Sequence, residues 1–244
     1  MKDKVVIVTG ASSGIGASVA RAMHDRGATV VLAARSESVI KRMEKELPGS
    51  LAIPTDMTIE RQVERLIKKT EERFGRIDIL VNNAGQGYDA SVVDIDMDRY
   101  KAIMELDFFS VIRTMQLVAP IMERGGGGSI MNVSSGLALM HLPNMGGYAA
   151  AKAALAHISL TAREELKDKG IRVGVIYPYI TETEFERNTL HEQDHIETGT
   201  VAADYEMPAG DSADYVAGIL IEGIISGAAQ VYAHDWMATG GARP

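Results

Sequence analysis

The chain has 244 residues, of which 46% are hydrophobic, so it is long enough to bury a large core in one α/β domain. Its 33 acidic side chains outnumber its 25 basic ones and give a formal net charge of −8, which argues against nucleic-acid or anionic-membrane binding and favours small-molecule chemistry. With no cysteine, the chain has no disulfide, thiolate metal ligand or cysteine nucleophile.

The first apolar run covers residues 5–8 and ends at Thr9 and Gly10. A run of this length is too short for the core of a signal peptide and far too short to span a bilayer. We therefore expect a soluble, cytoplasmic protein.

Short β-branched runs alternate along the chain with longer amphipathic stretches. Regular alternation of this kind predicts a doubly wound parallel sheet with helices on both faces, in a single domain spanning residues 1–244. The glycines at 125–128 separate a helix from a strand, so we interpret them as a tight turn rather than a linker. The predicted strands are 5–9, 29–33, 51–54, 77–81, 129–133 and 172–177.

The first strand leads into a glycine-rich loop at residues 9–16 and then a predicted helix at 17–26. Glycines allow a pyrophosphate to approach the backbone, and the helix start offers unpaired N–H groups and the positive end of its dipole. Glycines in a loop often form only a turn, but a strand before and a helix after favour phosphate binding. The spacing differs from Gly-x-Gly-x-x-Gly, because three residues separate Gly10 from Gly14 and one separates Gly14 from Gly16.

Tyr148 and Lys152 are four residues apart, which puts a phenol and an ammonium on one face of a helix. A tyrosine has a pKa of about 10, and a fixed neighbouring cation favours the phenolate and makes the side chain a better proton carrier. The alternative is that the two side chains share a solvated helix face. The remaining motifs decide between these readings.

Four further motifs occur in order with this pair: Thr-Gly-x-x-x-Gly-x-Gly at residues 9–16, Asn-Asn-Ala-Gly at 82–85, Ser135 upstream of Tyr148, and Pro178 with Thr183. Together they resemble the single-domain branch of the short-chain dehydrogenase/reductase family. The resemblance implies a seven-stranded Rossmann fold, a nicotinamide dinucleotide, and hydride transfer to or from a carbonyl or alcohol carbon. It fades through residues 184–210, which form the substrate lid in the family.

The resemblance implies that Tyr148 is the acid/base on the substrate oxygen and that Ser135 places that oxygen. Lys152 then holds the nicotinamide ribose and lowers the pKa of Tyr148. On local sequence alone Ser134 is an equally good candidate, and only the family spacing to Tyr148 favours Ser135.

Asp107 stands where relatives have Asn, whose main-chain carbonyl in the family holds a water that links the lysine to solvent. A charged side chain here would oppose phenolate formation at Tyr148. We therefore hypothesise that Asp107→Asn lowers the basic-side pKa of the oxidation reaction. The alternative is a capping or surface position with no effect on the rate.

The end of the second strand decides the cofactor, because NAD enzymes of this fold place an acidic side chain there. Ala34 occupies that place and Arg35 follows, so NADP (NADPH) is expected and NAD is less favoured. Ser13 weakens this, because many NADP-using relatives carry a second basic residue in the glycine loop. The resemblance implies that Asp56 contacts the adenine amino group and that Thr183 contacts the nicotinamide carboxamide. The remaining expected cofactor contacts are Gly10, Ser12, Gly14, Ile15, Gly16, Ser36, Met57, Asn83, Ala84, Gly85, Tyr148, Lys152 and Pro178.

The substrate pocket is expected to include Tyr88, Leu137, His141 and Tyr179, the last standing where a glycine commonly follows the proline. Apolar side chains between Ser135 and Tyr148 favour an apolar or aromatic carbonyl compound, although ordinary packing explains them equally well.

Residues 191–195 read His-Glu-x-x-His, the zinc-protease motif, but no third ligand or buried helix face accompanies them, so we expect no metal. A cofactor-binding sensor of the same fold normally lacks the Tyr148 and Lys152 pair, and an extended-branch epimerase or dehydratase has a different glycine spacing. Long predicted helices at 96–122 and 146–169 resemble those that join family homodimers and homotetramers.

Overall fold

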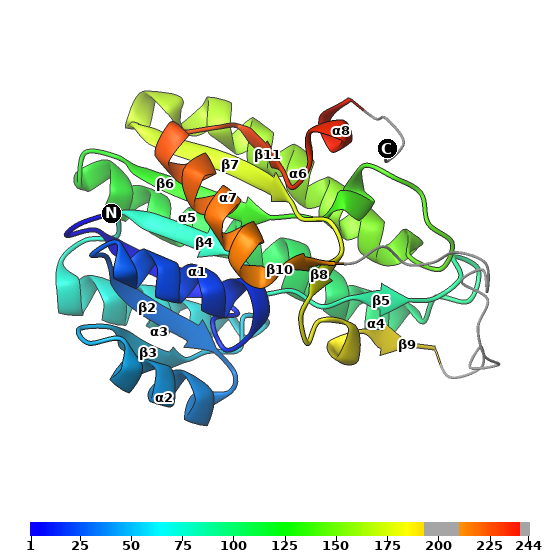
Figure 1. Cartoon of the computed structure of the whole chain (residues 1–244), viewed down its shortest axis with the longest axis horizontal. Helices are drawn as coiled ribbons and strands as arrows, with labels where there is room; N and C mark the ends of the chain where they lie inside the picture. The colour runs from blue at the N-terminus through cyan, green and yellow to red at the C-terminus, as the bar shows by residue number, and fades with distance from the viewer. Residues whose placement is uncertain (193–209, 240–244) are drawn as a thin grey trace.

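The computed structural model describes residues 1–192 and 210–239. Its centre is a seven-stranded parallel sheet in the order β11-β7-β6-β4-β1-β2-β3 (Figure 1). The predicted α/β Rossmann-like fold is therefore confirmed. The strands are β1 (Val5–Thr9), β2 (Thr29–Ala34), β3 (Leu51–Pro54), β4 (Ile79–Asn82), β6 (Gly128–Val133), β7 (Ile171–Tyr177) and β11 (Gln230–Tyr232).

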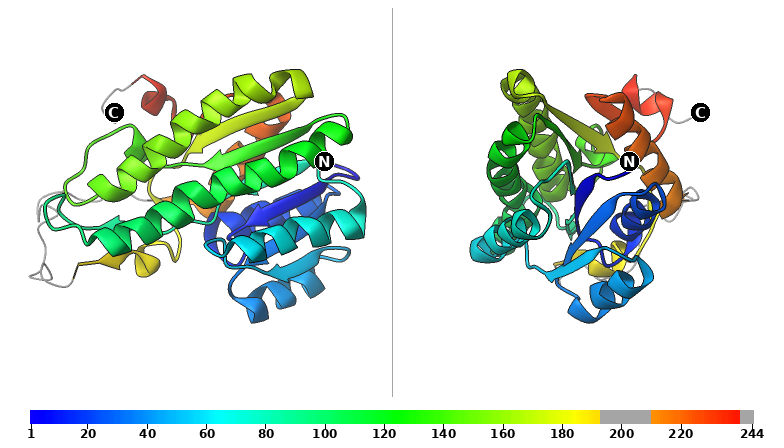
Figure 2. Two further views of the ribbon diagram at one scale, coloured as in Figure 1. Left: turned by 180° about the vertical axis from the view of Figure 1, so that it is seen from behind. Right: turned by 90° about the vertical axis from the view of Figure 1, so that its left-hand side faces the viewer.

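Helices cover both faces of this sheet, as the end-on view in Figure 2 shows. One face carries α1 (Gly14–Asp25), α2 (Glu37–Glu46) and α7 (Ala213–Ser226). The other carries α3 (Glu60–Phe74), α5 (Ser110–Arg124) and α6 (Gly146–Leu166).

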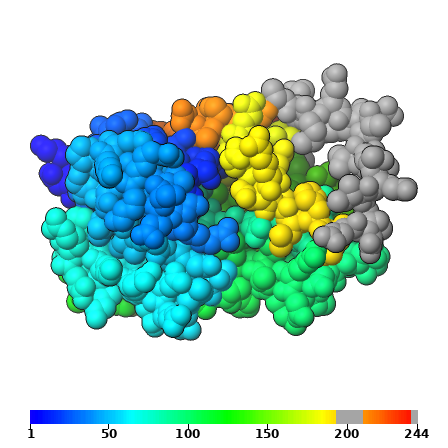
Figure 3. All heavy atoms as spheres, turned by 90° about the horizontal axis from the view of Figure 1, so that it is seen from below, coloured from blue at the N-terminus to red at the C-terminus, as the bar shows by residue number. Residues whose placement is uncertain are grey.

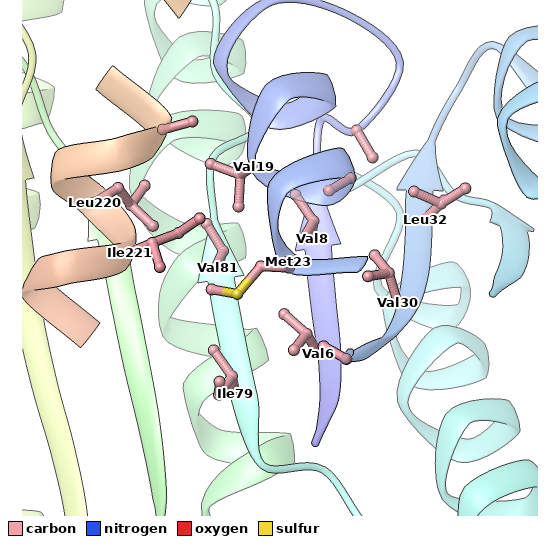
Figure 4. Close-up of a cluster of buried hydrophobic side chains, with 14 of the residues drawn as sticks. Val6, Val8, Val19, Met23, Val30, Leu32, Ile79, Val81, Leu220 and Ile221 are labelled. Carbon is pink, nitrogen blue, oxygen red and sulfur yellow. The ribbon is translucent and has the colours of Figure 1, made fainter. Parts of the chain in front are cut away.

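Alternation of side chains along the strands builds a separate core on each face. On β1, Val6 and Val8 pack with α1 and α7, whereas Val5 and Ile7 pack with the helices of the opposite face. Figure 4 shows Val6 and Val8 of β1 on either side of Met23 of α1, within this cluster. Because both faces are covered, the strands are nearly continuous runs of Val, Ile, Leu and Ala rather than alternating polar and apolar residues.

The predicted helix at 96–122 is interrupted. It consists of α4 (Met97–Met104), a π-helical turn η1 (Glu105–Phe109) and α5. Asp96 caps α4, because its carboxylate accepts hydrogen bonds from the N–H groups of Asp98 and Arg99. Such π turns are frequent at functional sites, and this one carries Asp107, whose side chain is fully buried.

Two small strand pairs fix the chain that follows β7 above the carboxyl ends of the main strands. β5 (Tyr88–Asp89) pairs with β9 (Leu190–His191), and β8 (Thr181–Glu182) pairs with β10 (Asp211–Ser212). The remaining short elements are η2 (Gly136–Ala138), η3 (Lys167–Lys169), η4 (Glu186–Asn188) and α8 (Asp235–Ala238).

The glycines at 125–128 form the expected turn between α5 and β6, and Gly126 and Gly127 both have positive φ. Within 1–192 and 210–239, no helix is both long and apolar enough to cross a membrane.

Candidate active site

The glycine-rich loop between β1 and α1 forms a cradle that no side chain could occupy. A Cβ on Gly16 would lie 2.3 Å from the carbonyl oxygen of Gly10, and Gly14 has a φ of +51°. Ser13 is the N-cap of α1 but its side chain makes no capping hydrogen bond, so the helix start is open to an anion. A cradle of this kind suits a dinucleotide pyrophosphate, and the contacts expected of Gly10, Ser12, Ser13, Gly14, Ile15 and Gly16 stay a prediction.

Thr9 at the end of β1 ties this loop to the Asn-Asn-Ala-Gly turn after β4. Its buried hydroxyl accepts hydrogen bonds from the backbone N–H of Asn83 at 2.9 Å and of Ala84 at 3.0 Å. The Asn83 amide returns a hydrogen bond to the Thr9 carbonyl at 3.0 Å. Sequence reasoning gave Thr9 no role of its own, although its place in the glycine motif could have suggested one.

A buried polar network lies beneath the site and joins four elements. The side-chain amide of Asn82 donates to the side-chain oxygen Oδ1 of Asn132 at 2.9 Å. The side-chain amide of Asn132 in turn donates to the Ser159 hydroxyl at 2.8 Å. The Thr114 hydroxyl donates to Asn82 Oδ1 at 2.9 Å. The network therefore connects β4, β6, α5 and α6, and sequence reasoning missed it.

Tyr148 and Lys152 both lie buried on α6, which excludes the alternative that they share a solvated helix face. The Lys152 ammonium lies 5.7 Å from the centroid of the Tyr148 ring. Lys152 Nζ also donates to the carbonyl oxygen of Val133 at 3.2 Å, which fixes its position at the end of β6.

The two candidate serines occupy different environments. The Ser134 hydroxyl is buried and donates to the carbonyl oxygen of Lys152 at 2.9 Å, so it holds backbone together. The Ser135 hydroxyl is partly exposed, accepts a hydrogen bond from the Leu137 N–H at 3.2 Å, and lies close enough to the Tyr148 phenol to oppose the rise of its pKa. Of the two, Ser135 is the one beside the phenol.

Asp107 makes a direct ion pair with Lys152, and Asp107 Oδ2 lies 3.1 Å from Lys152 Nζ. The other oxygen, Oδ1, accepts a hydrogen bond from the Gln86 N–H at 2.9 Å. Gly85 lets the turn close over the pair, because a Cβ there would lie 3.1 Å from both Asp107 Oδ2 and Lys152 Nζ. The interpretation of Asp107 as a surface or capping position is therefore wrong.

Burial has the largest effect on the pKa values of Asp107 and Tyr148. It raises the pKa of Asp107, with the Lys152 charge and the Gln86 hydrogen bond opposing the rise. It also raises the pKa of Tyr148 well above its ordinary value, and the negative charge of Asp107 adds to this while the Ser135 hydrogen bond opposes it. The structure thus differs from the expectation that Lys152 lowers the pKa of Tyr148, because burial of the phenol is the main effect and the ammonium is paired with a carboxylate.

The expected adenosine side is formed by residues that follow β2 and β3. Ala34 is buried, whereas the Arg35 guanidinium and Ser36 are exposed at the start of α2. Within the described part of the chain, no carboxylate pairs with Arg35. Asp56 is half-buried and accepts hydrogen bonds from the Thr58 N–H and hydroxyl, and Met57 beside it is buried.

The segment after β7 meets the glycine loop. Pro178 accepts a hydrogen bond from the Gly136 N–H at 2.7 Å, which joins it to the turn after Ser135. A Cβ on Gly14 would lie 2.9 Å from the Thr183 methyl group, so Thr183 lies against the cradle, and its expected contact with the nicotinamide carboxamide stays a prediction. Figure 3 shows this yellow segment at the surface, between the blue amino-terminal part and the green region.

The four expected substrate contacts lie in different places. Leu137 packs in the cluster that contains Tyr148. Tyr88 lies in the same cluster but is fully buried, and its hydroxyl bonds Glu192 and the Asp96 N–H. Burial and Glu192 raise the pKa of Tyr88 to about 12.

The other two expected substrate contacts have different surroundings, and their contact with a substrate stays a prediction. His141 is exposed in the loop before α6, and the Tyr179 ring packs edge-on against Trp236 at 5.2 Å and His234 at 5.9 Å. Sequence reasoning missed Phe185, whose ring lies 5.6 Å from the Tyr148 ring. Its apolar character in the lid region was the available signal.

The zinc-protease reading of residues 191–195 rests partly on Gln193, Asp194 and His195, which lie outside the described residues. Its first two members already have partners: His191 Nδ1 lies 3.3 Å from Asp89, and Glu192 bonds Tyr88 and pairs with Arg99 at 3.1 Å. Within the residues that the structure describes, no group of three or more acidic or histidine side chains could hold a metal ion.

Comparison with known proteins identifies relatives across most of the chain. Residues 4–194 match the family model described as short chain dehydrogenase. An uncharacterised oxidoreductase of Staphylococcus saprophyticus is 34% identical over 194 residues, which cover 78% of this chain and 83% of the relative. An uncharacterised oxidoreductase of Staphylococcus aureus is 32% identical over 185 residues, 75% of this chain and 80% of the relative.

Solved structures of the same kind resemble the fold closely. A 7α-hydroxysteroid dehydrogenase in complex with NADH and 7-oxoglycochenodeoxycholic acid has a TM-score of 0.84 and 28% identity, covering 94% of this chain and 91% of the other. An alcohol dehydrogenase from Thermococcus sibiricus in complex with 5-hydroxy-NADP has a TM-score of 0.77 and 26% identity, with 89% and 88% coverage.

Proposed function

The chain belongs to the short-chain dehydrogenase/reductase family and is an NAD(P)-dependent oxidoreductase with a small-molecule substrate, and from this premise we propose its finer activity. We propose that it transfers hydride between NADP(H) and the carbonyl or secondary alcohol of a small, apolar substrate. The observation that carries the proposal is the convergence of Ser135, Tyr148 and Lys152 at the carboxyl ends of the strands, beside the glycine cradle.

Tyr148 and Ser135 act on the substrate oxygen. During reduction the Tyr148 hydroxyl donates its proton to that oxygen, and Ser135 holds the oxygen by a hydrogen bond, so the developing alkoxide meets a donor and a proton together. The nicotinamide supplies the hydride when it is bound. Burial of Tyr148 excludes bulk water from the proton transfer.

The cofactor is held by backbone and side chains from both halves of the sheet. The glycine cradle and the open start of α1 receive the pyrophosphate, and Lys152 offers a hydrogen bond to the nicotinamide ribose. Thr183, which lies against the cradle, would contact the nicotinamide end, and Asn83 with Gly85 would line the ribose on the adenine side.

The preference for NADP rests on Arg35. Its exposed guanidinium follows the buried end of β2, where an acidic residue would repel a 2′-phosphate, and a guanidinium forms a charge-assisted, forked contact with that phosphate. The 5-hydroxy-NADP complex of the related alcohol dehydrogenase is compatible with this preference.

The proposal of an apolar substrate is supported by the apolar side chains that surround Tyr148. Leu137, Met145 and Phe185 pack in one cluster with the Tyr148 ring. The 7-oxo bile acid bound to the related hydroxysteroid dehydrogenase supports the same class, a ketone on an apolar body. We also propose residues 184–210 as the substrate lid, of which 193–209 lie outside the described residues.

The test follows NADPH and NADH absorbance against a panel of ketones and secondary alcohols. We expect turnover with apolar ketones and NADPH, lost about 10²- to 10⁴-fold in Tyr148→Phe with the cofactor still bound. Cofactor binding without turnover on any ketone or alcohol would contradict the proposal and favour a cofactor-sensing protein.

Assembly into a homodimer or homotetramer is proposed from the outer surfaces of α5 and α6. Phe109, which precedes α5, is 47% exposed, and α5 and α6 run side by side along one face of the sheet (Figure 2). Light scattering of the purified protein decides between monomer, dimer and tetramer.

A further inference from the structure

The ion pair between Asp107 and Lys152 sets the charge next to Tyr148. The two side chains are almost completely buried, with exposed fractions of 0% for Asp107 and 4% for Lys152, and their atoms lie 3.1 Å apart. A pair at this distance is close to neutral when seen from a third group, whereas a lone ammonium would favour the phenolate of Tyr148.

Asp107 is also fixed from several sides, so the pair does not open easily. The π-helical turn directs its carboxylate inward, and the Gln86 N–H donates to its Oδ1. Oδ2 of Asp107 has no hydrogen-bond partner with good geometry. Its negative charge is therefore compensated by the electrostatic attraction of the nearby Lys152 ammonium. An asparagine at this position would keep the contact with Gln86 and would leave Lys152 unpaired.

Among residues 1–192 and 210–239, the titratable groups that face Asp107 are Lys152 and Tyr148 from α6, and the turn after β4 contributes the neutral Gln86 and Gly85. Glu105 lies in the same π-helical turn, but it is paired with Arg113 at 2.9 Å and is partly exposed.

We propose that Asp107 is a positioning residue that holds Lys152 in a neutral pair and thereby keeps Tyr148 protonated through the neutral pH range. The site is thus built to give a proton to a carbonyl oxygen rather than to take one from an alcohol, and this rests on the proposed function for its reaction. In that step the carbonyl carbon receives hydride from the reduced nicotinamide, and the oxygen receives the Tyr148 proton. After the alcohol product leaves and the site opens to solvent, one proton taken up from solvent restores the phenol of Tyr148.

The protonation state can be measured without turnover. Difference absorbance of the protein minus its Tyr148→Phe variant reports the phenolate of Tyr148 as the pH rises. We expect no phenolate below about pH 10, the ordinary pKa of tyrosine, in the protein itself. Phenolate near neutral pH in that titration would overturn the proposal, whether or not a substrate is found.

The variant Asp107→Asn tests the cause. Its phenolate is measured against Asp107→Asn combined with Tyr148→Phe, and we expect it to appear at least one pH unit lower. The basic limb of alcohol oxidation should shift by the same amount, with about tenfold faster oxidation near pH 7. Glu105→Gln is the control, because it removes a carboxylate from the same turn without touching Lys152, and neither readout should move.

An unchanged phenolate titration in folded Asp107→Asn overturns the proposal, as does an equal shift in Glu105→Gln. Thermal melting shows whether each variant folds. If Asp107→Asn does not fold, the phenolate titration of the unsubstituted protein still tests the proposal. A missing substrate affects only the oxidation profile, so failure of the proposed function and failure of this inference are distinguishable.

Discussion

The ring of Phe185 lies 5.6 Å from the ring of Tyr148, and this contact joins the segment after β7 to α6. Phe185 is held in place by its N–H, which donates to the Thr183 hydroxyl at 3.2 Å, and by the narrow space beside Gly87. A proposed cofactor contact and a proposed substrate wall therefore lie two residues apart, and one backbone segment positions both.

Replacing Phe185 with Ala should widen the pocket next to Tyr148. We expect kcat/KM for small ketones to fall about 10- to 200-fold, the range for losing part of an apolar pocket, while bulkier ketones lose less or gain. The measurement is kcat/KM across a series of ketones of increasing size. Phe109→Ala is the control, since that ring lies outside the site, and equal losses for all sizes would contradict a role in selectivity.

Local sequence patterns predicted the parts of the structure that depend on neighbours in the chain. The glycine loop, six of the seven main strands and the Tyr148 and Lys152 pair all depend on periodicity, on turn chemistry or on a four-residue helical spacing. The seventh strand, β11 at Gln230–Tyr232, was missed because it has only three residues and is not fully buried, so it gives no apolar run.

Sequence reasoning could not predict the orientations of side chains that are set by contacts with residues distant in the chain. Sequence reasoning expected a charged Asp107 side chain to oppose phenolate formation at Tyr148, but it did not give the direct ion pair, in which the π-helical turn aims the carboxylate at Lys152, 45 positions away. No residue type marks a π turn in advance. Likewise no local pattern showed that the Tyr179 ring packs edge-on against Trp236 and His234, and its expected substrate contact stays a prediction.

The Arg35 guanidinium should determine the choice between NADP and NAD. Arg35→Ala is expected to weaken NADPH binding about 10- to 150-fold, because a charge-assisted hydrogen bond contributes about 1.5–3 kcal/mol, and to leave NADH binding nearly unchanged. Binding is measured by calorimetry for both nucleotides. Arg42→Ala, which removes an exposed arginine from α2, is the matched control, and an equal loss for NADH would refute the assignment.

The Thr9 hydroxyl should contribute both to the stability of the fold and to cofactor binding. Thr9→Val keeps the shape but removes the acceptor for the N–H groups of Asn83 and Ala84, so we expect a loss of about 1–3 kcal/mol in the free energy of unfolding and weaker cofactor binding. Chemical denaturation and nucleotide titration measure the two effects. Thr161→Val, at an exposed threonine on α6, should leave both unchanged.

Asp78 should make the fold sensitive to acid. Burial alone would raise the pKa of its carboxyl, but hydrogen bonds from Arg76, the Val5 N–H at 2.9 Å and Lys4 at 3.1 Å outweigh burial and hold the pKa below its ordinary value. A lowered pKa in the folded state means that the stabilisation is fully present above about pH 3.9, the unfolded value, and is lost as the pH falls through the folded value.

Asp78→Asn should therefore lower the free energy of unfolding at pH 7 by about 1.5–3 kcal/mol, since it removes the charge that Lys4 and Arg76 contact and keeps an acceptor for Val5. It should also flatten the dependence of stability on pH between roughly pH 5 and pH 2. Urea unfolding across that range measures both effects. Asp168→Asn, at an exposed aspartate, is the control, and parallel pH curves for Asp78→Asn and the unsubstituted protein would show that Asp78 is not the group that titrates.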